Sequence, residues 1–311
     1  MSNSAFGTIQ NQVLTNLMRQ YVNEIYIFDK IFPMKSRLSK KELEFINLGT
    51  EHLKKRNLKR AKGSESARWK PTFTSIQDEM FQYSIEAPYE WEDDEEEVDI
   101  GIRKRELIYI ENQDILMLNN EIDASNILAT ASNYTYTRTL SGTDQWNDYA
   151  NSTPIEDIDL ARFNIRNNGY GVVPNTIVMG YSVYDKLKNH PDFLERAKYN
   201  YAGQTRSKPV VTPEIMANIL DVDMVYVGWG VYDNNGTSTD IFGKWCNLIY
   251  INPSFDQMGK TFSLSLGLNG YPKVEEYNED KTRSTVIRNL ETHAKIIRDP
   301  NCGGLLINAV A

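Results

Sequence analysis

The alternation of apolar and polar residues predicts one long helix in the first half of the chain. Residues 102–132 contain no glycine and no proline. Apolar residues recur there at helical spacing, at Ile108, Ile115, Leu118, Ile122 and Ala129. At about 1.5 Å per residue the helix would be roughly 45 Å long. Its remaining faces carry small and polar side chains, so we expect burial on one side only.

Two-residue alternation predicts strands before and after this helix. In residues 81–91, every second side chain is apolar or aromatic, and Pro88 restricts such a strand to a sheet edge or an exposed hairpin. Because charged residues flank it, we interpret this strand as part of a projecting ribbon. Residues 261–311 predict long closing strands with a turn near residues 278–281.

The middle of the chain predicts an α/β arrangement, so the fold class as a whole is α+β. Residues 133–175 are rich in loop-forming residues. After them we expect a strand at 176–180, a helix at 183–199 interrupted by Pro191, and strands at 222–232 and 244–253. A helix at 213–220 has Thr212 as its expected N-cap, and residues 233–240 are expected to form a loop. A short amphipathic helix is also expected at about 13–25.

The composition is that of a folded globular protein. The 311 residues are 41% hydrophobic, enough for one large or two ordinary domains. Cys246 and Cys302 are too few for a disulfide framework, and their surroundings lack the spacing of a zinc site. Neither a signal peptide nor a transmembrane run is evident, so we expect synthesis in the cytoplasm and no contact with a membrane.

Charge is distributed very unevenly along the first hundred residues. Residues 35–70 carry 12 Lys or Arg against 4 Asp or Glu, whereas residues 71–102 carry 11 Asp or Glu and no Lys or Arg. We interpret the two blocks as complementary surfaces of neighbouring copies, which would fix register and orientation. The expected contact residues are Lys54, Lys55, Arg56, Arg60, Glu92, Asp93, Asp94, Glu95, Glu96 and Glu97. Two solvated faces remain the alternative.

Residue patterns typical of catalysis or cofactor binding are weak in this chain. Residues 254–261 end in Gly-Lys-Thr, but Ser254 replaces the first glycine of a phosphate-binding loop and a strand follows. The three histidines, His52, His190 and His293, belong to no metal or catalytic motif. The acidic block lacks the ligand spacing of a calcium loop. We therefore expect no catalytic residue, no cofactor, no metal and no enzymatic activity.

Several stretches, taken in order, resemble tailed-bacteriophage major capsid proteins. They are VLTNLMRQYVNEIYIFDKIFP (13–33), LKRAKGSESARW (58–69), LSGTDQWNDYANSTPIEDI (140–158), VPNTIVMGYSVYDKLKNHPDFLERAKY (173–199), DVDMVYVGWGVY (221–232) and IFGKWCNLIYINP (241–253). The resemblance covers most of residues 12–255 and is strongest over 173–199.

This resemblance implies the Hong Kong 97-type capsid fold. The family's parts would be an N-terminal arm at 1–35, an extended loop (E-loop) at 36–99, a peripheral (P) domain at 100–161 and 259–311, and an axial (A) domain at 162–258. The P domain would contain the long spine helix at about 102–132.

The resemblance also implies a function. The chain would assemble with itself, as pentamers and hexamers, into the icosahedral shell of a virion in the host cytoplasm. It would enclose double-stranded DNA without sequence-specific contacts, beside a portal and, in some relatives, scaffolding or decoration proteins. The net charge of −8 suits a container that does not grip its DNA. An encapsulin-like cellular nanocompartment shell is the alternative, and a nucleotide-binding α/β enzyme is a more distant one.

Overall fold

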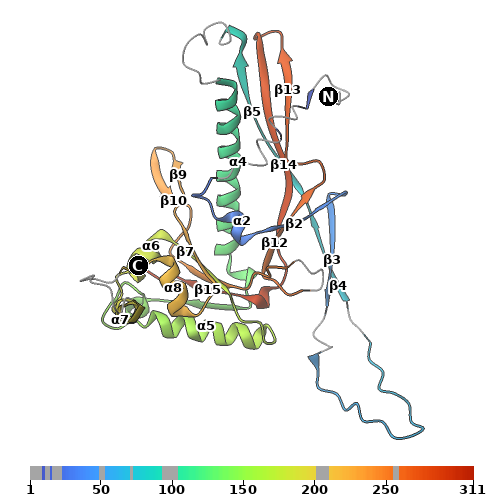
Figure 1. The fold of residues 1–311 in the computed structure, drawn as a ribbon, viewed down its shortest axis with the longest axis vertical. Helices are drawn as coiled ribbons and strands as arrows, with labels where there is room; N and C mark the ends of the chain where they lie inside the picture. Colours follow the sequence, from blue (N-terminus) through green and yellow to red (C-terminus); the bar gives the residue numbers. More distant parts are fainter. Residues whose placement is uncertain are drawn as a thin grey trace.

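The computed structural model shows an elongated α+β protein built from two lobes (Figure 1). It describes residues 9–10, 15, 23–48, 53–70, 73–92, 104–200, 210–254 and 259–311. The predicted helix at about 13–25 falls almost entirely outside these ranges. Within them, no helix is long and apolar enough to cross a bilayer.

The first lobe, here called the peripheral lobe, consists of a long helix lying along a long sheet. The helix is α4 (Lys104–Ala129), which confirms the helix predicted at 102–132. The sheet contains β1 (Ile9–Gln10), β13 (Lys273–Glu279), β14 (Ser284–Ile297), β12 (Ser263–Leu268) and β2 (Met34–Leu38) in that order, and β5 (Phe81–Glu90) also pairs with β14. The closing strands and their turn lie where the sequence predicts them.

Strand β5 corrects one expectation. It is an edge strand, as Pro88 requires, but it does not belong to a projecting hairpin. All ten of its residues pair antiparallel with β14, from Phe81 opposite His293 to Glu90 opposite Ser284. Its alternating Tyr83 and Ile85 pack in a core cluster with side chains of α4. This pairing buries the apolar face of the strand, and a projecting hairpin would leave it in water.

Helix α4 buries a different face from the one that its isoleucines predict. The buried positions include Tyr109, Leu116, Ala124 and Leu128, whereas Ile115 is exposed. Polar residues at Asn112, Gln113, Asn120, Glu121 and Ser125 share the buried face. They are tolerated there because most of them bind neighbouring elements: the Asn112 amide, for example, donates to the carbonyl of Ile287, and the Ser125 hydroxyl to that of Ile241.

A two-stranded ribbon projects from the peripheral lobe. It consists of β3 (Glu42–Leu48) and β4 (Phe73–Glu79), which pair antiparallel along their full length. At its base, Leu43 and Met80 pack against Leu264, Leu266 and Ile296 of the sheet. Residues 53–70 continue beyond the ribbon and reach away from the rest of the molecule (Figure 1).

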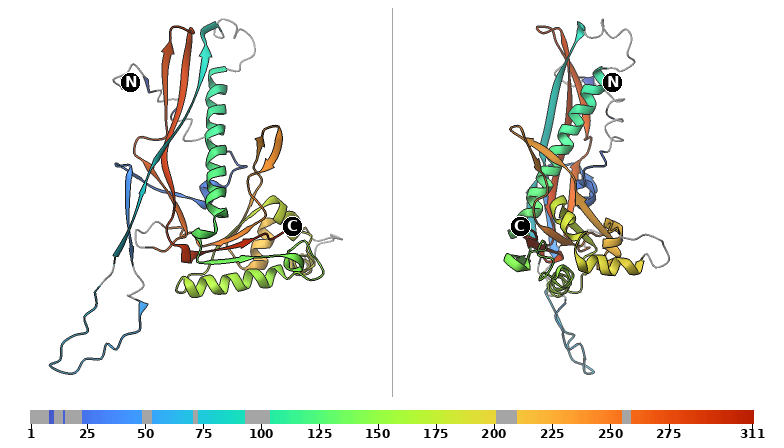
Figure 2. Two further views of the ribbon diagram at one scale, coloured as in Figure 1. Left: turned by 180° about the vertical axis from the view of Figure 1, so that it is seen from behind. Right: turned by 90° about the vertical axis from the view of Figure 1, so that its left-hand side faces the viewer.

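The second lobe, here called the axial lobe, is built on a five-stranded sheet. Its order is β6 (Tyr136–Thr139), β15 (Gly303–Ile307), β11 (Cys246–Ile249), β7 (Thr176–Gly180) and β8 (Met224–Gly228). Every residue of β7 is buried, because both faces of the sheet are covered. The helices α5 (Pro154–Asn168), α6 (Tyr181–Leu187), α7 (Pro191–Asn200) and α8 (Pro213–Leu220) accompany this sheet (Figure 2).

Two local predictions in the axial lobe are wrong and one is confirmed. The loop-rich reading of 133–175 missed α5, whose buried Ile155, Ile158 and Ala161 recur at helical spacing. The expected loop at 233–240 is largely a hairpin of β9 (Val231–Asn234) and β10 (Thr237–Asp240). Thr212 does cap α8, since its hydroxyl accepts from the Ile215 N–H at 3.4 Å.

The two lobes share one apolar core, which lies between α4, the segment around α2 and the axial sheet. It joins Leu128 of α4 and Phe32, which follows the short helix α2 (Phe28–Ile31), to Val178, Phe242 and Leu305 of the axial lobe. Strands β6 and β15 lie in the axial sheet although the resemblance assigned residues 100–161 and 259–311 to the P domain. The domain boundaries themselves stay a prediction.

Candidate subunit interface

The basic residues predicted to contact a neighbour lie on the loop at the end of the ribbon, here called the basic loop (53–70). It carries eight Lys or Arg and one Glu. Lys54, Lys55 and Arg60 are exposed, and Arg56 is partly buried. Leu58, between these cations, is 76% exposed, which is unusual for so large an apolar side chain. A surface that is both cationic and apolar suits contact with an acidic protein surface.

Local contacts give the basic loop a defined shape. The Arg56 guanidinium lies over the Trp69 ring at 5.2 Å, so the two arms of the loop are joined by a cation–π contact. At the tip, the Arg60 Nε donates to the carbonyl of Ser64 at 2.6 Å. Gly63 has φ +85°, a conformation that favours glycine and lets the chain reverse there. The loop is therefore organised within one subunit before any partner binds.

Of the acidic run predicted at 92–97, only Glu92 lies among the described residues. Its carboxylate is 3.4 Å from the guanidinium of Arg283 in the turn between β13 and β14. Asp93, Asp94, Glu95, Glu96 and Glu97 lie outside the described residues. Glu92 follows β5 at the end of the peripheral lobe where α4 begins, whereas the basic loop occupies the opposite end of the molecule (Figures 1 and 2). The structure does not bring the basic loop and Glu92 together within one subunit.

An exposed aromatic cluster on the axial lobe was not predicted from the sequence. Trp229, in the turn after β8, is 52% exposed, and its ring lies 4.9 Å from that of Tyr181 and 5.9 Å from that of Tyr184. The preceding Gly228 fits tightly, because a Cβ there would lie 2.2 Å from the ring of Phe242. Gly228 thus allows close packing beside Trp229.

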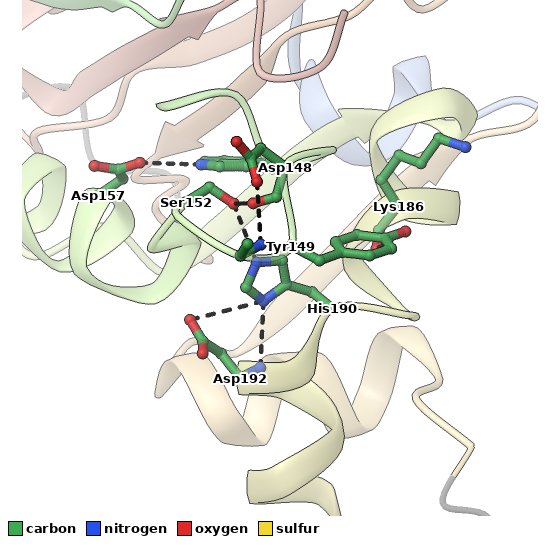
Figure 3. A network of polar contacts seen from close by, with 9 residues as sticks. Asp148, Tyr149, Ser152, Asp157, Lys186, His190 and Asp192 are labelled. Atoms are coloured by element: carbon green, nitrogen blue, oxygen red, sulfur yellow. Dashed lines mark hydrogen bonds and ion pairs between the residues drawn. The ribbon is translucent and has the colours of Figure 1, made fainter. Parts of the chain in front are cut away.

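A Ser–His–Asp grouping in the axial lobe has the composition of a catalytic triad (Figure 3). His190 is buried, its Nε2 lies 3.1 Å from the Ser152 hydroxyl, and its Nδ1 accepts from the backbone N–H of Asp192 at 3.2 Å. Because Nδ1 accepts, the ring proton is on Nε2, which donates to Ser152. The hydroxyl of Ser152 in turn donates to the carbonyl of Asp148 at 2.6 Å.

This arrangement cannot activate Ser152. A general base needs a free lone pair toward the hydroxyl, and here that nitrogen carries the proton. Burial also lowers the pKa of His190, which keeps the ring neutral. His190 instead caps the start of α7, and the network holds the 148–152 turn against that helix.

The Gly-Lys-Thr stretch has a structural role as well. Lys260 donates to the carbonyl of Gly169 at 2.7 Å, where α5 ends, and its ammonium lies over the Tyr170 ring at 5.2 Å. A cation is favourable at a helix C-terminus. Strand β12 follows Thr261, so the helix N-terminus that a phosphate-binding loop requires does not follow this stretch.

A buried polar cluster lies between α4 and β14. It consists of Asn120 and Glu121 on the helix and Glu291, His293 and Lys295 on the strand. Burial raises the pKa of Glu121 to about 7, lowers that of His293 to about 3 and lowers that of Lys295. The cluster borders a cavity of about 570 Å³ beside α2. Sequence patterns could not reveal it, since each member resembles a surface residue when considered alone.

Comparison with known proteins places this fold among viral shells. The protein-family model described as phage major capsid protein E matches residues 124–245. The major capsid protein of Burkholderia phage BcepMu is 26% identical over 281 residues, which cover 88% of each chain. The major capsid protein of Pseudomonas phage JBD67 is 25% identical over 207 residues, covering 63% of this chain and 64% of that one.

Solved structures agree in fold. A phage-related protein from Bordetella bronchiseptica RB50 superposes with a TM-score of 0.75 at 19% identity, covering 97% of both chains. The capsid of cyanophage P-SCSP1u gives 0.57 at 10% identity over 99% of this chain and 90% of that one. A virus-like particle from Pyrococcus furiosus gives 0.51 at 10% identity over 94% and 95%.

At these identities, structural similarity establishes only the fold. Phage capsids and the virus-like particle share that fold. The sequence relatives point to phages. The stretch that matches the family model lies within the part of the chain in which we recognised the capsid resemblance. In sequence, therefore, this chain is similar to phage major capsid proteins, and its fold is that of tailed-phage capsids of the Hong Kong 97 type.

Proposed function

We propose that the chain assembles with itself, as pentamers and hexamers, into the icosahedral shell that encloses a phage's double-stranded DNA. The relationship to the BcepMu major capsid protein over 88% of both chains is the observation that supports this most strongly. The net charge of −8 also fits, because a strongly basic lining would hold the packed DNA. Assembly would take place in the host cytoplasm, with a portal and, where used, scaffolding or decoration proteins as partners.

The basic loop and the acidic run would join neighbouring subunits. Glu92, where the run begins, and the basic loop lie at opposite ends of an elongated molecule (Figure 1). If subunits meet head to tail, the basic loop of each one contacts the acidic run of the next, so each subunit uses both surfaces once. Such heterologous contacts close into rings. Electrostatic complementarity of this kind fixes register and orientation more than it adds affinity.

Electron microscopy of the expressed protein tests the assembly. Negative-stain images should show shells, tubes, or rings of five and six subunits. A chain that stays monomeric at high concentration, with and without a scaffolding protein, contradicts the proposal. Purified shells should contain DNA when recovered from virions, whereas a nanocompartment would contain a protein cargo.

Charge reversal tests the interlocking surfaces separately. Changing Asp94, Glu95, Glu96 and Glu97 to Lys should prevent assembly and leave the monomer folded. Reversal of Lys54, Lys55 and Arg56 to Glu should do the same, and combining both sets in one chain should restore assembly. If the acidic reversal assembles normally, the paired-surface proposal fails, although the capsid function stands.

A further inference from the structure

The cavity beside α2 lies where the sheet of the peripheral lobe is split. Strand β14 pairs with β12 as far as His293 and with β13 from Leu290, so Glu291 and Thr292 stand between these two partner strands. Residues of α2, β2, α4 and the turn before β13 complete the walls. The cavity volume of about 570 Å³ is typical of sites that bind small molecules.

Two buried polar atoms on the wall of this cavity lack a hydrogen-bond partner. Gln113 of α4 is 4% exposed, and its Nε2 donates to the Glu291 Oε1 at 3.1 Å. The Gln113 Oε1, however, accepts from no group among the described residues, and the hydroxyl of the buried Thr292 is also unpartnered there. Native proteins rarely leave such atoms unpaired unless water or a ligand supplies the partner.

The mouth of the cavity carries a carboxylate that is also unpaired. Asp29 of α2 is exposed, and it forms no hydrogen bond or ion pair with the described residues. Around the cavity, the carboxylates are Asp29, Glu121, Asp123 and Glu291, and the cations are Arg37 and Lys295. Burial keeps His293 neutral. Negative charge is therefore in excess at a site with unfilled hydrogen-bond acceptors.

We propose that the cavity binds a linear aliphatic diamine, with one ammonium group at the floor and the other at the mouth. The inner ammonium donates to the Gln113 Oε1 and to the carboxylate of Glu291, and the outer ammonium pairs with Asp29. Between them, the methylene chain lies against Phe32 and Met117. The site is contained within one subunit, so the proposal is independent of the assembly proposed above.

Other classes of ligand fit this cavity less well. An anion would need the buried cation Lys295, whose Nζ already donates to the Asn120 Oδ1 at 2.8 Å and lies 3.8 Å from the Asp123 carboxylate. No group of three or more His, Cys, Asp or Glu in the described part of the chain could hold a metal ion. A neutral apolar molecule would leave the Gln113 Oε1 and the Asp29 carboxylate unpaired.

The affinity for a diamine should rise with pH. Asp29 is accessible, but the surrounding protein removes enough water to raise its pKa to about 6, with Glu291 acting in the same direction and Lys295 opposing. Glu121, with its pKa at about 7, ionises over the same range and adds negative charge. Aliphatic amines stay protonated up to about pH 10. Binding should therefore be stronger at about pH 8 than at about pH 5.

Isothermal titration calorimetry and saturation-transfer NMR on the full, unassembled chain test the proposal at constant ionic strength. Putrescine, the four-carbon diamine, should bind one site per chain with a dissociation constant below about 1 mM at about pH 8. Butylamine has only one ammonium group and should bind at least about fivefold more weakly. Butanediol is neutral and should not bind. If neither method detects putrescine at about 10 mM, or if butanediol binds equally well, the proposal is overturned.

Two variants test where the diamine binds. Asp29→Asn removes the unpaired carboxylate at the mouth and should weaken putrescine binding at least about fivefold. Asp123→Asn is the matched control, because it removes a carboxylate near Lys295 that does not line the cavity, and it should weaken binding less than about twofold. Equal losses in the two variants would indicate general attraction of cations and would overturn the assigned site.

Discussion

Glu121→Gln is the change that tests most directly how the N-terminal part of the chain is held. The Glu121 carboxylate is fully buried on α4 and accepts from the backbone N–H groups of Ile27 at 3.1 Å and Phe28 at 2.8 Å. Burial is the largest influence on its pKa, which rises from an ordinary 4.5 to about 7, and Asp29 contributes in the same direction. The bonds from Ile27 and Phe28 and the nearby Lys295 oppose that rise without cancelling it.

The sign of the pH effect follows from the raised pKa. The folded chain holds this proton more tightly than the unfolded chain, so the proton stabilises the fold at low pH. That contribution is complete below about pH 4.5 and is lost as the pH rises through about 7. The gap between 4.5 and about 7 corresponds to about 3 kcal/mol in the free energy of unfolding. A glutamine side chain does not titrate, so the variant should lose about 3 kcal/mol less than wild type as the pH rises.

Urea unfolding of the monomeric chain, followed by tryptophan fluorescence at about pH 5 and about pH 8, measures this difference. Other titrating groups are common to both proteins, so they largely cancel in the comparison. Glu111→Gln provides the matched control, since Glu111 lies on the same helix with an exposed side chain and should leave the pH dependence unchanged. Equal pH dependence in wild type and Glu121→Gln would refute the assigned role of the buried carboxylate.

Three further changes test other parts of the fold. Burial lowers the pKa of His293 from 6.5 to about 3, so the neutral ring's contribution to stability is lost as the pH falls from about 6.5 to 3. His293→Gln should therefore lose about 5 kcal/mol less than wild type in an acid titration followed by circular dichroism. Leu128→Ala removes a fully buried side chain and should lower the free energy of unfolding by about 2–5 kcal/mol, whereas the exposed Leu58→Ala should change it by less than about 0.5 kcal/mol; similar urea midpoints would contradict this. Gly228→Ala places a Cβ 2.2 Å from the Phe242 ring and should destabilise by at least about 1–3 kcal/mol, which an unchanged melting temperature would exclude.

Sequence patterns predicted which residues form helices and strands better than they predicted which side of each element is buried. The long run without glycine or proline was enough to predict α4, but Ile115 of the predicted stripe is exposed and Glu121 is buried. A hydropathy pattern predicts that a carboxylate is exposed to water. It contains no information about the two backbone N–H groups that donate to the carboxylate of Glu121. The same limitation hid the contacts among Asn120, Glu291 and Lys295, because they depend on a partner far away in the sequence.

The missed helix α5 has a different cause. Its buried Ile155, Ile158, Ala161 and Ile165 follow helical spacing, and Pro154 stands at its first turn, where proline is favoured. The signal was present, but the loop-forming residues on both sides of the segment obscured it. Strand pairing, in contrast, was not available from local patterns. Nothing in Gly303–Ile307 indicates that this strand lies between β6 and β11.

The uneven distribution of charge can be read from the sequence, but the surface that each charged block contacts cannot. Counting residues predicts a basic block followed by an acidic block, and their closeness in sequence would suit mutual neutralisation within one subunit. The ribbon keeps the basic loop away from Glu92, because it carries that loop to the opposite end of the molecule (Figure 1). Exposed charges farther apart than a Debye length, about 8 Å at physiological salt, barely interact. Charge complementarity between the basic loop and Glu92 can therefore act only between subunits, which is why reversing both blocks together is a more decisive experiment than reversing either one.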